Sequence, residues 1–182
     1  QEVSGERWIP IPEPVREIQT AALDWSQQPS AHHVPIGMTA REPLWVSVIE
    51  MDTVLIGGAR RMGKTRLIHS WIQALLRGKQ AKLLLWDGKN GLEFARYAGQ
   101  PQVTVAGDLR EALAPLVAEV GERERLFRGR GVTSLAEYNA GAGAKLPILV
   151  PVIDEAAFIP DEAGKTIVEL VARCGAFGVH PI

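Results

Sequence analysis

A glycine-rich segment in the first half of the chain carries the clearest chemical signal in the sequence. Residues 58–65 read GARRMGKT, which matches the pattern G-x-x-x-x-G-K-[ST]. A short apolar run from Val54 to Ile56 precedes the segment, and a helical pattern from Lys64 to Arg77 follows it. A strand, a glycine-rich loop and a helix in this order turn backbone N–H groups toward phosphate oxygens. The segment therefore predicts a binding site for the phosphates of a nucleotide.

Each residue type in this loop has a physical role. Gly58 and Gly63 allow tight turns and let the backbone approach phosphate oxygens closely. The ammonium group of Lys64 supplies a cation for the β- and γ-phosphates, and the Thr65 hydroxyl is a ligand for Mg²⁺. The residues expected to contact ATP are Gly58, Ala59, Arg60, Arg61, Met62, Gly63, Lys64, Thr65 and Arg66. The sequence leaves open whether Arg60 and Arg61 contact phosphate, a partner or only solvent.

Two adjacent carboxylates follow an apolar run further along the chain. Residues 148–153 read ILVPVI and lead directly into Asp154 and Glu155. At the end of a buried strand and downstream of a phosphate loop, Asp154 is placed to hold Mg²⁺ through its coordinated water. Glu155 is placed to orient or deprotonate the attacking water, which separates an ATPase from a passive nucleotide binder. Pro151 cannot donate a ladder hydrogen bond, so it predicts a bulge or an edge position in this strand.

Strand and helix patterns alternate from Thr53 onward, and these elements must position the two motifs. Such alternation predicts an α/β fold with a mostly parallel sheet and helices on both faces. Asp108 with Glu111, and Ser134 with Glu137, are spaced as helix-starting capping boxes. Besides those around the phosphate loop, strands are expected over 46–49, 83–86, 103–106, 148–153 and from 179 to 182. Helices are expected over 14–25, from 108 through Phe127, from 134 through Tyr138, and over 161–173.

The composition fits one globular domain and excludes several classes of protein. The chain has 182 residues, of which 46% are hydrophobic, and its formal net charge is −1. This near-neutral charge argues against a polybasic nucleic-acid binder, although it permits a motor that holds DNA with a few residues per subunit. A single cysteine, Cys174, excludes a disulfide framework and favours a reducing cytoplasm. No apolar run has the length of a membrane span, and no signal peptide is evident.

Several further segments lie between the two motifs and after them. In chain order they are VPIG at 34–37, DGK at 87–89, LEF at 92–94, YAG at 97–99, ER at 122–123, GV at 131–132, AEYN at 136–139 and GVH at 178–180. Together with the phosphate loop, their order and spacing resemble the FtsK/SpoIIIE family of ring ATPases. The resemblance extends from about His33 to His180, which is most of the chain.

This resemblance implies a RecA-like fold and a ring, expected to be a hexamer, that moves along double-stranded DNA at the expense of ATP. It also implies that an arginine of one subunit acts at the ATP of the next. Arg123 and Arg125 are the candidates by position. With Lys64 and Glu155, Arg123 therefore completes the expected catalytic set. The expected location is the cytoplasm, with any membrane attachment outside this chain.

Departures from the family pattern keep other functions open. Arg61 and Met62 stand where the family has small residues, and the chain stops at Ile182, before the family's sensor segment. We expect a proline-rich arm over residues 1–41 and an ATPase core, incomplete at its C-terminal end, over 42–182. The alternatives are an FtsK-like ring ATPase of a protein secretion system, suggested by the near-neutral charge, and a nucleotide-binding module without turnover.

Overall fold

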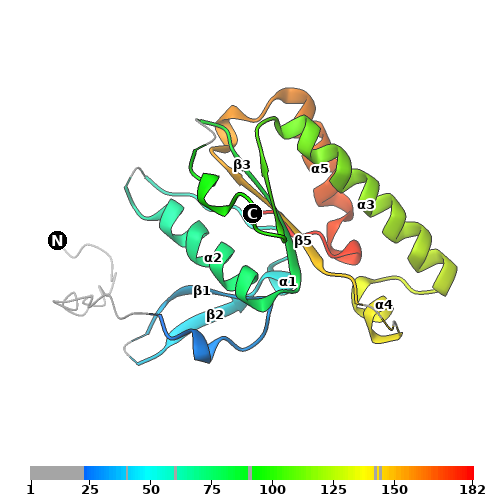
Figure 1. Ribbon diagram of the computed structural model, residues 1–182, viewed down its shortest axis with the longest axis horizontal. Coiled ribbons are helices and arrows are strands. Elements are labelled where there is room, and N and C mark those ends of the chain that lie inside the picture. Colours follow the sequence, from blue (N-terminus) through cyan, green and yellow to red (C-terminus); the bar gives the residue numbers. More distant parts are fainter. Residues whose placement is uncertain (1–22, 40, 60, 90–91, 142, 144) are drawn as a thin grey trace, which may run out of the picture.

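Figure 1 shows the computed structural model, which describes residues 23–39, 41–59, 61–89, 92–141, 143 and 145–182. Its α-helices are α1 (Val48–Met51), α2 (Lys64–Gly78), α3 (Leu109–Arg130), α4 (Leu135–Gly141) and α5 (Asp161–Phe177). Its strands are β1 (His33–Met38), β2 (Pro43–Ser47), β3 (Ala81–Asp87), β4 (Val103–Ala106) and β5 (Ile148–Asp154). Short 3₁₀ helices are η1 (Trp25–Gln27), η2 (Ala95–Tyr97) and η3 (Ala156–Phe158). The helix predicted over 14–25 lies outside the described residues, except for its last three positions.

The central sheet is parallel, with the strand order β4-β3-β5. The β3–β5 register runs without a shift from Ala81 opposite Ile148 to Asp87 opposite Asp154. The carboxyl ends of these two strands therefore lie side by side. The α/β class predicted from the alternating pattern is confirmed, because helices cover this parallel sheet on both faces (Figure 1).

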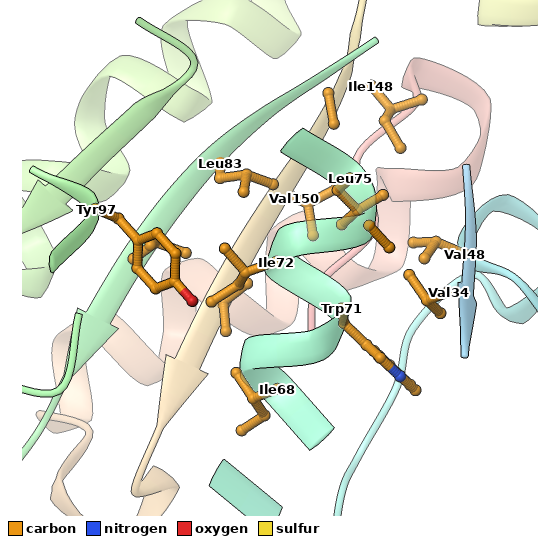
Figure 2. Packing of buried hydrophobic residues seen from close by; sticks show 14 of the residues in the cluster. Val34, Val48, Ile68, Trp71, Ile72, Leu75, Leu83, Tyr97, Ile148 and Val150 are labelled. Carbon is orange, nitrogen blue, oxygen red and sulfur yellow. The ribbon is translucent and has the colours of Figure 1, made fainter. Parts of the chain in front are cut away.

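Alternation of side chains along β3 explains the two layers of helices. Ala81, Leu83 and Leu85 pack with α2 on one face, whereas Leu84 and Trp86 pack with α3 and α5 on the other. Figure 2 shows the first layer, in which apolar side chains of α2 face Leu83 and Val150 of the sheet. Burial of each such side chain contributes roughly 1.5–3 kcal/mol relative to exposure. This layer fixes α2, and with it the phosphate loop, against the sheet.

A separate antiparallel hairpin, β1–β2, packs beside α2. The Trp71 side chain of α2 lies toward this hairpin in Figure 2, and its indole N–H donates to the Pro35 carbonyl at 2.6 Å. The predicted boundary between Arg41 and Glu42 falls between the two paired strands. The strand predicted over 46–49 is only partly right, because the chain turns into α1 at Val48.

The last residues of the chain lie between β5 and the segment that leads into the phosphate loop. Leu149 and Ile153 donate to the carbonyls of Gly178 and Ile182, both at 2.8 Å, and Val179 forms an isolated parallel bridge with Leu149. The strand predicted over 179–182 is therefore only partly right, because the segment runs beside β5 without forming an assigned strand. Pro151 causes no bulge, since its missing N–H belongs on this side of β5, away from the β3 ladder. Val54 donates to the Pro181 carbonyl at 2.9 Å, although 54–56 forms no assigned strand, contrary to the prediction.

Candidate nucleotide site

The phosphate loop joins the segment beside residue 181 to the first turn of α2. Gly63 has φ +91°, a backbone conformation that side chains disfavour, and α2 begins at the next residue, Lys64. Arg61 also lies in the left-handed region, with φ +63°, which is uncommon for a residue other than glycine. The Met62 side chain is largely exposed. The two residues that depart from the family pattern are therefore at the strained and solvent-facing tip of the loop.

Lys64 lies over the loop that precedes it. Its Nζ donates to the Gly58 carbonyl at 2.6 Å, and a Cβ placed on Gly58 would meet Lys64 Cγ at 3.6 Å. The ammonium group is thus held against the carbonyl of the first glycine of the motif. This is the place from which a lysine neutralises phosphate charge while the first N–H groups of α2 point in the same direction.

The acidic pair lies at the carboxyl end of β5, as the sequence predicted. Asp154 is the last residue of the strand, and its Oδ1 accepts the Glu155 N–H at 3.0 Å. Glu155 has φ +60°, so the chain reverses sharply here and enters η3. A positive φ is uncommon for a residue other than glycine, so the backbone is strained at this position.

These segments enclose a cavity of about 470 Å³. The residues that line it are Ala59, Arg61, Met62, Gly63, Lys64, Thr65, Arg66, Lys89, Asp154 and Glu155. The structure therefore brings together the predicted phosphate loop and the predicted acidic pair, which are about ninety residues apart in the chain. Gly58 contributes through its carbonyl contact with Lys64, and Arg60 lies outside the described residues.

Negative charge accumulates at this end of the sheet. Burial raises the pKa of Asp154, and the carboxylates of Glu155, Asp87 and Glu93 raise it further, against the effect of the Glu155 N–H bond. Among the described residues, no three His, Cys, Asp or Glu side chains form a protein-only metal site. Mg²⁺ commonly takes one or two protein oxygens together with waters and phosphate oxygens. Thr65 and Asp154, which line one cavity, fit that requirement.

Lys89 is the pocket residue to which the sequence analysis gave no role. Its Nζ lies 3.4 Å from Glu155 Oε1. The sequence feature that could have indicated Lys89 as a site residue is its position just after β3, because the carboxyl ends of neighbouring parallel strands meet at one edge of the sheet. Which strands are neighbours, however, is a property of the folded sheet.

The predicted role of Arg123 at the ATP of a neighbouring subunit is incompatible with its position. The side chain has no exposed surface, and its guanidinium donates to the Phe177 carbonyl at 2.7 Å, the Pro147 carbonyl at 2.8 Å and Glu119 at 3.1 Å. All three guanidinium nitrogens are used inside the chain. Arg125, the other candidate, has a side chain that is 75% exposed. It forms an ion pair with Glu122, three residues earlier on the same helix.

Comparison with known proteins decides the family. The FtsK/SpoIIIE family model matches residues 15–180. The chain belongs to the FtsK/SpoIIIE family. It is 29% identical over 180 residues to the DNA translocase SftA of Bacillus subtilis strain 168, covering 90% of this chain and 19% of that protein. It is 31% identical over 176 residues to DNA translocase FtsK 2 of Ralstonia nicotianae, covering 78% of the chain and 22% of that protein.

Solved structures of P-loop ATPases share the fold of this FtsK/SpoIIIE chain. The pCW3 conjugation coupling protein TcpA, in a monomer form with ATPγS, superposes with a TM-score of 0.69 at 25% identity, covering 84% of this chain and 48% of that one. The cytoplasmic domain of the Type VII secretion ATPase EccC of Thermomonospora curvata gives 0.68 at 25% identity, covering 88% and 22%. The chain is thus a P-loop ATPase domain with a RecA-like core.

The FtsK/SpoIIIE chain spans about a fifth of the length of the two curated relatives. Within the part of the chain that the structure describes, no helix is both long and apolar enough to cross a membrane. The family and the fold support nucleotide binding.

Proposed function

We propose that this chain is the ATP-hydrolysing core of a motor that moves double-stranded DNA. The observation that carries the proposal is a cavity lined by Lys64 and Thr65 of the phosphate loop together with Asp154 and Glu155 at the carboxyl end of β5. Membership of a family whose curated relatives are named DNA translocases supports DNA as the substrate that is moved. We place the activity in the cytoplasm, where both ATP and DNA are available.

The positions of the residues around the cavity support a specific role for each. The loop backbone and Lys64 hold the phosphates, and Thr65 and Asp154 would hold Mg²⁺, which when bound offsets phosphate charge. Glu155 accepts a proton from the attacking water. The water oxygen bonds to the γ-phosphorus as the bond to the β–γ bridging oxygen breaks, so ADP and inorganic phosphate are the products.

The proposed site is open to solvent in a single subunit. Ala59, Arg61 and Met62 line the cavity and are themselves exposed. A neighbouring subunit that covers the cavity would exclude water and add charge, as composite sites require. We therefore propose a ring, with a hexamer as the expected size, in which Arg125 is the remaining candidate for the arginine supplied in trans.

The test is ATP hydrolysis by the intact protein with and without duplex DNA at one fixed, low salt concentration, because DNA affinity depends steeply on salt. We expect DNA to stimulate hydrolysis, and Lys64→Ala and Glu155→Gln to abolish it. Lys165→Ala and Glu169→Gln on the exposed side of α5 are matched controls and should behave as wild type. ATP turnover that duplex DNA leaves unchanged would contradict the DNA motor.

One alternative has a specific observation in its favour, the likeness to the secretion ATPase EccC at 25% identity. A motor of that kind would respond to a peptide signal of its cargo and ignore DNA. The same assay distinguishes the two, since a peptide-stimulated and DNA-independent rate would favour secretion. Tight ATP binding without turnover under every condition would instead indicate a non-hydrolysing module.

A further inference from the structure

The ion pair between Lys89 and Glu155 lies inside the proposed nucleotide pocket. Lys89 Nζ and Glu155 Oε1 are 3.4 Å apart, and both residues line the cavity with Lys64 and Thr65. The side chains are 46% and 42% exposed, so the pair is well solvated and weak. An anion that enters the pocket can therefore compete with Glu155 for the ammonium group.

The backbone that carries Lys89 is held in place on both sides of the pair. Asp87 Oδ1 accepts the Lys89 N–H at 2.9 Å, and Gly88 donates to the Asp154 carbonyl at 3.2 Å. Gly88 also fits tightly, because a Cβ there would lie 2.6 Å from the Trp86 ring and 2.8 Å from Phe158 Cβ. The Lys89 backbone is thus fixed relative to the acidic pair, and movement is left to its long, half-exposed side chain.

The same loop is tied to the helix of the phosphate loop. Asp87 Oδ2 accepts the Glu93 N–H at 3.4 Å, and Glu93 Oε1 lies 2.6 Å from His69 Nε2 on α2. His69 Nδ1 is in turn 2.8 Å from the Tyr97 hydroxyl. These contacts connect α2, which begins at Lys64, with the loop that follows β3. The loop that carries Lys89 is therefore connected both to the helix of the phosphate loop and to the acidic pair.

We propose that Lys89 senses the γ-phosphate by exchanging partners. It pairs with Glu155 while the pocket holds no γ-phosphate, and it transfers to a γ-phosphate oxygen when ATP binds. This inference rests on the proposed ATPase function. The exchange leaves the Glu155 carboxylate free to accept the proton of the attacking water, and it adds a second cation beside Lys64. ADP lacks the γ-phosphate and leaves the Lys89–Glu155 pair intact.

A double-mutant cycle on the intact protein tests the exchange. The variants are Lys89→Met, Glu155→Gln and the two combined, and calorimetry measures the affinities of AMP-PNP and ADP with Mg²⁺ at fixed salt. Glu155→Gln removes both the repulsion of phosphate and the competitor for Lys89, so it should tighten AMP-PNP binding. If the pair breaks on binding, this gain is larger with Lys89 present, by about two- to fivefold for a partly exposed pair. ADP should show no such difference.

An equal gain from Glu155→Gln with and without Lys89 would overturn the inference, because the pair would then persist in the bound state. If the wild type bound neither AMP-PNP nor ADP, the proposed function would be overturned as well. The Lys64→Ala variant shows the calorimetric signal expected when nucleotide does not bind. Lys89→Arg keeps the positive charge and should therefore retain the coupling to Glu155. A side chain with a purely structural role would give no reason for the coupling to depend on charge. Should Lys89→Met fail to fold, Lys89→Gln takes its place, and unchanged ADP affinity checks that the site is intact.

Discussion

Arg123 is the residue whose position departs most from what its type suggests. An arginine with no exposed surface is rare unless it is paired, and here Glu119 and two carbonyls satisfy the guanidinium. Burial lowers its pKa, while the Glu119 carboxylate opposes this shift. The two carbonyls belong to Pro147, just before β5, and Phe177, at the end of α5. Arg123 therefore ties α3 to the base of the strand that carries the acidic pair.

Replacement of this arginine should destabilise the fold rather than weaken catalysis directly. Arg123→Met leaves the part-buried Phe177 and Pro147 carbonyls and Glu119 without their partner, and we expect the free energy of unfolding to fall by about 3 kcal/mol. Urea denaturation monitored by circular dichroism measures this change. Arg128→Met, which removes an exposed pair with Glu124 on the same helix, should cost about 0.5 kcal/mol or less. Equal losses in the two variants would contradict the structural role.

The turn after β3 is the element that connects the site to the fold. Asp87 lies opposite Asp154 in the β3–β5 register, and its carboxylate accepts the N–H groups of Lys89, Leu92 and Glu93. Gly88 passes between the Trp86 ring and Phe158 of η3. The two turns that follow neighbouring strands are therefore packed against one another, and a change in one displaces the other.

A single methyl group should disturb this packing. Gly88→Ala places a Cβ 2.6 Å from the Trp86 ring and 2.8 Å from Phe158 Cβ, so the turns must shift apart. We expect a loss of about 2 kcal/mol in unfolding free energy, the usual range for overpacking, together with slower ATP hydrolysis. Thermal unfolding and steady-state turnover report the two effects.

Gly121 on α3 supplies the matched control. A Cβ there would meet no atom within 4 Å, and Gly121→Ala should stabilise the helix by up to about 1 kcal/mol. If Gly88→Ala were as stable and as active as Gly121→Ala, the packing of the two turns would not matter for the site.

The whole molecule presents its nucleotide pocket to solvent, and the proposed ring would complete it. Arg125 lies on the exposed side of α3 and does not line the pocket of its own chain. An arginine that acts on the ATP of a neighbouring subunit must be exposed and must lie outside the pocket of its own chain. Arg128, one turn further along α3 and equally exposed, provides the comparison.

If Arg125 acts on a neighbour, Arg125→Ala should lower ATP hydrolysis by the assembled protein at least about tenfold, whereas Arg128→Ala should have little effect. Mixing the inactive Arg125→Ala and Glu155→Gln proteins should restore part of the activity, because some sites then combine an intact Glu155 with an intact Arg125. Hydrolysis is measured across a range of mixing ratios. A mixture as inactive as its components would argue against action in trans.

Local patterns predicted the parts of the fold that depend on neighbours in the chain. Asp108 accepts the N–H groups of Arg110 and Glu111 at the start of α3, as its spacing with Glu111 indicated. The strand over 103–106 and the helix from Lys64 were also predicted at their observed starts. The strand predicted over 54–56 was wrong, because a strand needs pairing along its length and this segment is joined to the end of the chain through the Val54 N–H and the Pro181 carbonyl.

Both nucleotide motifs could be recognised in the sequence, since the glycines, Lys64 and Thr65 of one and the apolar run before Asp154 of the other are short-range patterns. The pairing of β3 with β5, which brings Lys89 to Glu155, became evident in the folded chain. The tertiary structure also decided that Arg123 is buried and Arg125 exposed, although they are two residues apart on one helix. The physical reason is that partners across a sheet and burial on a helix depend on packing between distant segments, which residue type and spacing do not specify.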